Sequence, residues 1–377
     1  MKKFLLIPLV VVLMGSLIFG GCAAPAPAPA PVAPGPGPTP SPVPGPAAPA
    51  PAPAEVITLR YGNQNPETGW DGQHAAKPTL RRIEEATGGR IKFETYFGST
   101  LYAPPGAWEA VKSGIADVAW TWAGFKPGVT SLADVIALPF MPFKSAKQAS
   151  GIMWKLYEEF PSFAAQYNKE NKILFVWASS PYFLITTDKQ VKTMEDLKGM
   201  VIRVGGGPPT DQIKMLGAVP KGVGMTATYE NLQKGVLDGM AIPAEAFYTF
   251  RQYEVAPYVT WVDLHATYFA FAINWDTWNG LSADIQEAMT SVGGLEASEF
   301  YGYNMFDTAL DAAFEAADER GYTLYEYTLP DDEVARWTEI AGEPLWAQWV
   351  ADREAEGYSE AQEILDTCIA LIETYSP

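Results

Sequence analysis

Segments typical of strands alternate with segments typical of helices between residues 56 and 204. The strand-like segments are short and apolar and occupy residues 56–61, 91–97, 117–120, 173–177 and 201–204. Helix-like segments lie between them, for example at residues 79–85 and 108–112, and Gly88 and Gly89 end the first of these. Strands that alternate with helices form mostly parallel sheets covered by helices. The alternation therefore predicts an α/β fold.

The pattern changes to a longer helical periodicity after residue 283. Apolar side chains recur there at Ile285, Met289, Leu295 and Phe300. Two further helices are predicted over residues 331–350 and 361–375, and the sequence contains no internal repeat of the solenoid type. The C-terminal part of the chain is therefore predicted to be mainly helical.

The N-terminus has the order of a secretory signal. Two lysines follow Met1, residues 4–19 are apolar, and two glycines precede Cys22. The apolar stretch is interrupted by Pro8 and is shorter than the ~20 residues of a membrane-spanning helix, which makes a permanent membrane anchor the weaker alternative. Two small residues before a cysteine resemble a bacterial lipobox. Residues 1–22 are therefore predicted to be a lipoprotein signal peptide that ends at an acylated Cys22.

Residues 23–54 are almost wholly Ala, Pro, Gly and Val and carry no charge. A segment of this composition cannot bury a core, so it is predicted to be a disordered, semi-rigid tether. A proline-rich ligand for a recognition domain is the alternative, but no basic residue flanks the tract to orient such a complex.

The remaining residues, 55–377, are enough for two lobes with cores of their own, because 48% of the chain is hydrophobic and 13% is aromatic. The chain has 44 acidic against 26 basic side chains, and this excess excludes nucleic acid as a partner. If Cys22 is lipidated, Cys368 has no partner for a disulfide. Cys368 is therefore predicted to be a buried thiol in an apolar helix face.

The sequence lacks the residue patterns of the common catalytic sites. His74 and His265 are its two histidines, and no HExxH, CxxC or GxSxG motif is present. The glycines at 205–207 lack the spacing of a nucleotide-binding loop. A glycosidase with two carboxylates remains open from composition. The prediction is a protein that is not an enzyme and that uses no metal and no cofactor.

Five segments resemble the solute receptors of TRAP (tripartite ATP-independent periplasmic) importers, a family that includes the C4-dicarboxylate-binding proteins. These segments are EEATGGRIKFETYFGSTL at 84–101, VKSGIADVAW at 111–120, LADVIALPF at 132–140, TMEDLKGMVIRV at 193–204 and YENLQKGVLDGM at 229–240. Their order and spacing over nearly the whole of residues 55–377 carry the resemblance, and the lipoprotein-like leader agrees with it.

The resemblance implies a two-lobed fold like that of periplasmic binding proteins, with a cleft between the lobes, exchanged strands and a long connecting helix. Lobe I is expected to contain residues 55–180 and 268–307, and lobe II residues 181–267 and 308–377. The resemblance further implies an extracytoplasmic, lipid-anchored monomer that delivers a small carboxylate to an ion-gradient-driven permease in the membrane. The alternatives are a receptor lipoprotein of an ATP-driven importer and a surface adhesion lipoprotein.

Arg203 is the main candidate for ligand binding. It follows an apolar strand and precedes GGGPP at 205–209, after which a helix can begin. That arrangement directs a guanidinium and the free N–H groups of a helix N-terminus at one anion. In the family, the arginine at this point of the motif pairs with the substrate carboxylate. A structural salt bridge is the alternative role.

Matching to the family also predicts an apolar, aromatic pocket. Phe183 stands where a second arginine is frequent, Ile242 where an asparagine is frequent, and Trp122 where sialic-acid receptors carry an acid. The other residues expected at or near the cleft are Gln64, Met225, Tyr182, Glu245 and Trp261. Ligand sites are usually apolar with a few polar groups, although ordinary core packing is the alternative for each aromatic residue.

Overall fold

The computed structural model describes residues 25–28, 35, 37, 55–122, 124, 126 and 128–377. The chain divides into residues Met1–Ala52 and Pro53–Pro377, and the helices and strands of the described residues lie in the second unit. The predicted signal peptide with Cys22, and most of the predicted tether, lie outside the described residues. In the described part of the chain, no helix combines the length and the apolar character that crossing a bilayer requires.

The first sheet has five strands in the order β2-β1-β3-β10-β4. Their bounds are β1 Ile57–Gly62, β2 Ile91–Tyr96, β3 Val118–Thr121, β4 Lys172–Ala178 and β10 Tyr268–Ile273. Strand β1 pairs in parallel with β2 and β3, and β10 lies antiparallel between β3 and β4. Every residue of β3 and β10 is buried, as expected for central strands that are covered on both faces.

The second sheet has six strands in the order β11-β9-β5-β8-β6-β7. Their bounds are β5 Phe183–Thr186, β6 Val201–Val204, β7 Val219–Gly222, β8 Gly239–Ile242, β9 Tyr258–Trp261 and β11 Tyr325–Thr328. Here β5 lies antiparallel to β8 and β9, and the other pairs are parallel. The predicted α/β fold is confirmed. Both sheets are mixed, with one antiparallel strand inserted in each, and five of the nine strand pairs in the described residues are parallel.

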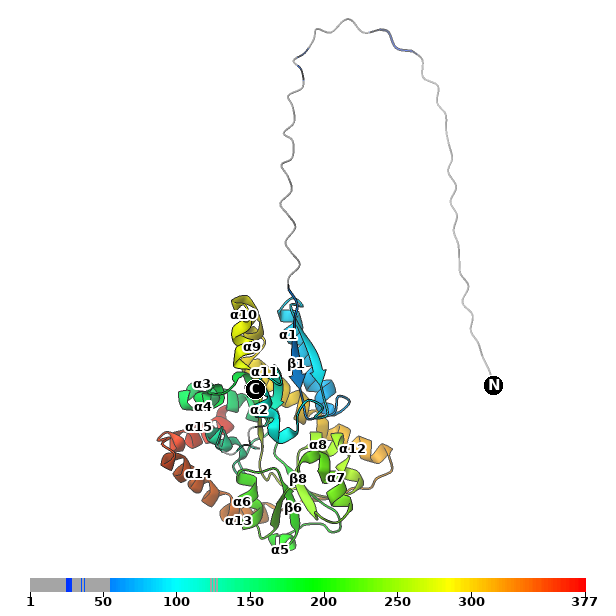
Figure 1. The fold of residues 1–377 in the computed structure, drawn as a ribbon. Helices are drawn as coiled ribbons and strands as arrows, with labels where there is room; N and C mark the ends of the chain where they lie inside the picture. The colour runs from blue at the N-terminus through cyan, green and yellow to red at the C-terminus, as the bar shows by residue number, and fades with distance from the viewer. Residues whose placement is uncertain are drawn as a thin grey trace, which may run out of the picture. The chain divides into compact units, whose positions relative to one another are not determined.

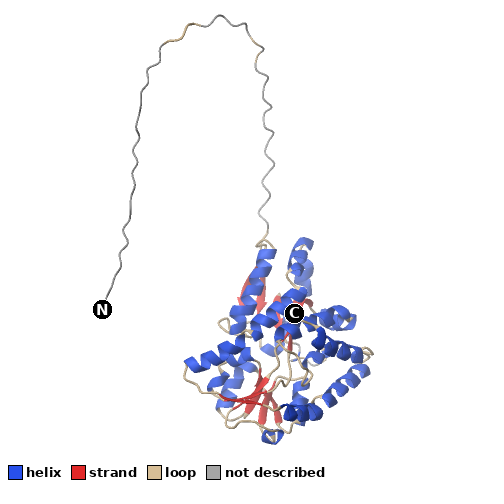
Figure 2. Cartoon of the chain, turned by 180° about the vertical axis from the view of Figure 1, so that it is seen from behind, coloured by secondary structure: helices blue, strands red, loops and turns tan. Residues whose placement is uncertain are grey.

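Helices cover both sheets (Figures 1 and 2). Those before β5 are η1 Gly72–Ala76, α1 Lys77–Ala86, η2 Pro104–Gly106, α2 Ala107–Lys112, η4 Ser131–Ala137, α3 Ala146–Glu159 and α4 Pro161–Asn168. Those between β5 and β10 are α5 Met194–Leu197, α6 Pro208–Met215, α7 Met225–Gln233, α8 Ala244–Thr249 and η5 Gln252–Glu254. Those after β10 are α9 Trp275–Gly280, α10 Ala283–Ser291, α11 Gly294–Gly302, η6 Tyr303–Asp307, α12 Ala309–Glu319, α13 Asp331–Ala341, α14 Glu343–Ala355 and α15 Ala361–Thr374.

Two of the segments that carry the chain between the sheets pair with each other. Residues 179–182 lead from β4 to β5, and residues 262–267 lead from β9 to β10. The Tyr182 N–H donates to the His265 carbonyl at 2.8 Å, and the Leu264 N–H donates to the Tyr182 carbonyl at 3.0 Å. This exchange explains why strands distant in sequence complete each sheet.

The predicted long connecting helix is present as three consecutive helical pieces. Helices α11, η6 and α12 follow one another from Gly294 to Glu319 with Thr308 as the single intervening residue. Helix α11 packs against α3 and β4 of the first lobe, and α12 packs against α8 of the second. A Cβ atom at Gly302 would lie 2.1 Å from the Oγ atom of Ser150, so a glycine is required where α11 meets α3.

The C-terminal helix α15 packs on the first lobe. Residues 308–377 were expected in lobe II, but α15 contacts α3 and η4 of lobe I. Its buried residues Ile364, Cys368 and Ile372 recur every four positions and join the core of the first sheet. An apolar helix face of this kind must be covered, and α3 supplies the apolar partner. Cys368 is buried, as expected.

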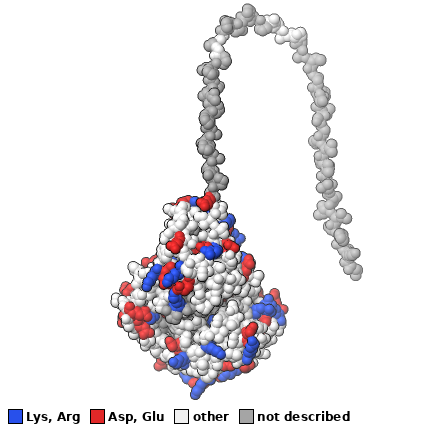
Figure 3. Space-filling model, in the orientation of Figure 1, with Lys and Arg blue, Asp and Glu red and all other residues white. Residues whose placement is uncertain are grey.

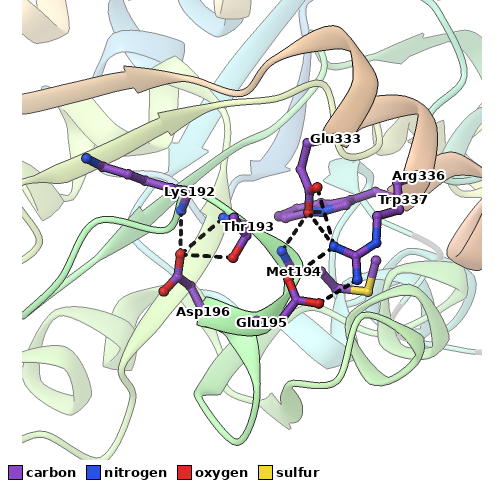
Figure 4. A network of polar contacts seen from close by, with 8 residues as sticks. All are labelled: Lys192, Thr193, Met194, Glu195, Asp196, Glu333, Arg336 and Trp337. Carbon is purple, nitrogen blue, oxygen red and sulfur yellow. Dashed lines mark hydrogen bonds and ion pairs between the residues drawn. The ribbon is translucent and has the colours of Figure 1, made fainter.

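Helix α13 is attached to the second lobe by a network of polar contacts (Figure 4). Glu333 accepts hydrogen bonds from the Met194 backbone N–H and from the Trp337 indole N–H, both at 2.8 Å. Arg336 forms ion pairs with Glu195 and Glu333. The network therefore ties α13 to the N-terminus of α5.

Candidate ligand-binding site

A pocket that is partly open to solvent is lined by residues of both sheets. Gln64 follows β1, Trp122 follows β3, Arg203 lies near the end of β6, and Glu245 follows β8. These positions are the carboxyl ends of parallel strands. In open α/β sheets, ligands bind in the crevice outside those ends. The topology thus brings the candidate residues of both lobes to one place.

The two lobes touch at the rim of this pocket. A Cβ atom added to Gly205 would lie 2.1 Å from the Cη2 atom of the Trp122 indole, and one added to Gly206 would lie 3.4 Å from the Gly124 carbonyl oxygen. Gly206 also has a φ of 121°, which favours glycine. Gly205 and Gly206 therefore allow the loop after β6 to lie directly against the Trp122 indole of lobe I.

Arg203 is a buried cation that has no counter-ion within the described part of the chain. Its side chain is 5% exposed, and its Nε atom donates to the Val223 carbonyl at 2.9 Å. Burial lowers the pKa of Arg203, and the neighbouring Tyr182 opposes that change. Among the residues that the structure describes, no carboxylate lies within 4.0 Å of the guanidinium. A buried charge is costly unless it is paired, so this site favours an anionic ligand.

His265 supplies a neutral polar group to the pocket wall. It is 4% exposed, and its Nδ1 atom lies 2.6 Å from the Oε1 atom of Gln212. Burial, together with the charge of Arg203, lowers the pKa of His265 to about 3. The ring is therefore uncharged at neutral pH, and His265 adds no second positive charge beside Arg203.

Glu245 lines the pocket but does not cancel the charge of Arg203. It is 3% exposed and accepts a hydrogen bond from the Thr249 hydroxyl at 2.6 Å. Burial, with a contribution from the nearby Asp71, raises the pKa of Glu245 to about 8. The carboxyl group is mostly protonated at pH 7, so the pocket presents one net positive charge to a ligand.

The rest of the wall is largely aromatic and sulfur-containing. Trp120 and Phe269 lie with ring centroids 4.8 Å apart, and Phe269 stacks on Phe306 at 5.7 Å. Met225 and Met305 also line the space. An apolar wall with a few polar groups is typical of sites for small organic ligands.

The structure brings most of the predicted site residues together. The predicted residues that line the pocket are Gln64, Trp122, Tyr182, Arg203, Met225 and Glu245. Three others lie elsewhere. Phe183 and Ile242 are paired across β5 and β8 and point into a separate core with Phe247. Trp261 packs against Phe183, at 4.8 Å between centroids, on that same side.

The placement of Phe183 has a simple geometric cause. Successive side chains of a strand point to opposite faces. Tyr182 joins the pocket side, so its neighbour Phe183 must turn away from it. Several residues that were not expected from the sequence also line the pocket. These missed residues are Asn65, Trp120, His265, Thr267, Phe269, Met305 and Phe306.

A local signal existed for some of the missed residues. Asn65 and Trp120 lie at strand ends, and His265 was one of two histidines. Met305 and Phe306 come from η6 of the long helix, and no local pattern links that helix to strand ends more than 100 residues away in the chain. Within the described residues, no group of three or more His, Cys, Asp or Glu side chains is arranged to hold a metal ion.

Comparison with known proteins gives one consistent result. A TRAP solute-binding protein from Rhodoferax ferrireducens, solved with copurified benzoate, has a TM-score of 0.78 and 26% identity, covering 84% of this chain and 98% of that one. One from Bordetella bronchiseptica, with bound (R)- and (S)-mandelate, has a TM-score of 0.77 and 27% identity, covering 84% and 99%. The C4-dicarboxylate-binding protein DctB of Bacillus subtilis is 25% identical over 292 residues, which are 73% of this chain and 77% of that protein. Residues 62–352 match the profile of DctP, and the chain therefore belongs to the bacterial extracellular solute-binding protein family 7.

Proposed function

We propose that this chain is the extracytoplasmic receptor of a TRAP importer and that it binds an organic acid by its carboxylate at Arg203. The observation that carries the proposal is the buried guanidinium between the two sheets, with no protein carboxylate within 4.0 Å among the described residues. A ligand carboxylate can accept two parallel hydrogen bonds from a guanidinium, which makes this pairing both strong and directional.

The proposed ligand has an aromatic body. Trp120, Phe269 and Phe306 offer ring faces and edges, and aromatic pairs contribute beyond the area that they bury. The similar proteins with benzoate and mandelate support the same class. Polyhydroxylated acids fit less well, because a hydroxyl against an apolar wall loses its water partners without replacement.

The receptor is proposed to hold its ligand without converting it. Its family consists of solute-binding receptors, and this membership supports binding without conversion. The ligand is expected to be recovered unchanged after incubation with the protein, and chromatography of the released solute checks this.

The proposed partners are the membrane subunits of the importer, and the proposed state is a monomer anchored by lipid at Cys22. The leader and the Pro/Ala tract of the sequence support the anchor. Loss of the protein from the membrane fraction on Cys22→Ser is the expected result, and retention of that variant would contradict the anchor.

On the face in Figure 3, Lys and Arg are interspersed with Asp and Glu rather than gathered into one basic surface.

A thermal-shift screen of residues 55–377 against benzoate, mandelate, succinate and glucuronate tests the proposal. A ligand at 100 times its dissociation constant adds about 2.7 kcal/mol to the stability of the native state. Benzoate or mandelate is expected to raise the melting temperature most. Stabilisation by glucuronate alone would contradict an aromatic ligand, and stabilisation by none of the acids would contradict the carboxylate class.

A further inference from the structure

The hydrogen bonds around His265 assign the proton on its ring. The Gln212 side-chain N–H donates to the Leu264 carbonyl at 2.7 Å, which identifies the end of the amide that carries the nitrogen. The other end, the Oε1 atom, faces the Nδ1 atom of His265 at 2.6 Å. An amide oxygen can only accept, so Nδ1 must carry the hydrogen. In the neutral ring, Nε2 is then an acceptor.

The Nε2 atom is left for a ligand. His265 lines the pocket whereas Gln212 does not, so the ring has one nitrogen in a protein network and its opposite edge toward the pocket. Among the described residues, no donor forms a hydrogen bond with Nε2. The low pKa of His265 keeps this acceptor unprotonated over the whole physiological range. An acceptor in a buried wall costs free energy when a bound ligand covers it without donating to it.

The acceptor lies close to the anion-binding group. The Tyr182 ring is 5.0 Å from the His265 ring, and its hydroxyl is engaged with the Thr267 hydroxyl at 2.8 Å, so it is not an obvious donor to Nε2. Tyr182 and His265 both line the pocket with Arg203, and both feel the charge of that guanidinium. A hydroxyl attached near a carboxylate held at Arg203 is therefore the group best placed to meet His265.

We propose that the Nε2 atom of His265 accepts a hydrogen bond from a hydroxyl next to the ligand carboxylate, so that the preferred solute is an aromatic 2-hydroxy acid. This inference rests on the proposed function and deepens it by naming the substrate class. Arg203 binds the carboxylate, His265 reads the hydroxyl, and the aromatic wall covers the ring.

Three related ligands test the proposal on the native protein. Mandelate carries the 2-hydroxyl, phenylacetate lacks it, and O-methylmandelate keeps the oxygen but cannot donate. Calorimetric titration is expected to show mandelate binding roughly tenfold more tightly than either analogue, the scale of one net hydrogen bond. Equal affinities for mandelate and phenylacetate would overturn the proposal while leaving the receptor function intact. Binding of none of these acids, nor of benzoate, would instead contradict the proposed aromatic ligand.

Variants connect the preference to His265. His265→Phe keeps a ring but removes the acceptor, so the roughly tenfold preference for mandelate over phenylacetate should disappear in this variant. Gln212 lies outside the pocket, and Gln212→Met removes the amide oxygen that keeps the hydrogen on Nδ1 of His265. This variant should reduce the preference for mandelate by a smaller factor than His265→Phe does. A full preference for mandelate in His265→Phe would overturn the assignment.

The protonation state can be observed without any variant. Nitrogen-15 spectra of labelled native protein should show Nδ1 with a bound hydrogen and Nε2 without one, and mandelate should shift the Nε2 resonance. The opposite tautomer, or an Nε2 resonance that mandelate leaves in place, would overturn the proposal even if His265→Phe does not fold.

Discussion

Arg203 combines a fixed charge with burial and the lack, among the described residues, of a protein counter-ion. Arg203→Ala leaves the ligand carboxylate buried without its partner, and such truncations cost ~2–5 kcal/mol, or roughly thirtyfold to several thousandfold in affinity. Arg203→Lys should recover part of the loss, because an ammonium cannot reproduce the planar two-donor fork. Calorimetry with benzoate measures all three proteins. Equal affinities in folded proteins would reduce Arg203 to a structural residue.

Glu245 predicts a pH dependence of stability. Its pKa is raised to about 8 in the folded protein from an ordinary value of 4.5, so the native state holds a proton that the unfolded state has lost between these values. The stabilisation is full below pH 4.5 and is lost as pH rises through about 8. Urea unfolding at pH 5, 7 and 9 should show the native protein losing stability relative to Glu245→Gln. A constant difference between the two proteins would contradict the raised pKa.

At the scale of elements, the loop after β6 must lie against lobe I for the pocket to be covered. Gly205→Ala places a methyl group against the Trp122 indole, and overpacking of this kind costs ~1–3 kcal/mol. The affinity for benzoate should fall by roughly five- to hundredfold on that scale. Trp122→Ala combined with Gly205→Ala restores the space and serves as the matched control. If Gly205→Ala binds benzoate like the native protein, contact between this loop and the indole is not needed for binding.

The attachment of α13 can be tested apart from binding. Glu333→Ala leaves the N–H of the fully buried Trp337 without an acceptor, which costs ~1–3 kcal/mol of stability. Glu333→Gln keeps a side-chain carbonyl oxygen at the same place and should retain most of that stability. Urea unfolding compares them, and both should bind benzoate like the native protein because the network lies outside the pocket. Equal stability of the Ala variant and the native protein would show that the network is not structural.

Elements with a strong local pattern could be predicted from the sequence, and their long-range placement could not. The strands around Ile91, Val118 and Val201 follow from apolar patterns and glycine boundaries, whereas the long connecting helix was implied by the family resemblance. The position of α15 on lobe I does not, because its apolar stripe would suit the core of either lobe. Phe183 and Trp261 lie in a different core from the Arg203 pocket, because matching by motif gives a position along β5 or β9 but not the face to which its side chain points.

At the scale of the whole molecule, the site depends on the exchange of strands. The crossing segments 179–182 and 262–267 pair with each other and place Tyr182 and His265 beside Arg203. Arg203 could be identified from its motif because one strand and the following glycines position it. His265 and Phe306 could not, since they reach the pocket only after the chain has crossed between lobes.

The central claim is that an organic acid lies between the two sheets with its carboxylate on Arg203. A crystal structure of residues 55–377 grown with benzoate tests it most directly. The ligand is expected in this pocket, with its carboxylate oxygens at hydrogen-bond distance, ~2.7–2.9 Å, from the Arg203 guanidinium and its ring against Trp120 and Phe269. Benzoate bound elsewhere, with Arg203 paired to a carboxylate of the protein itself, would contradict it.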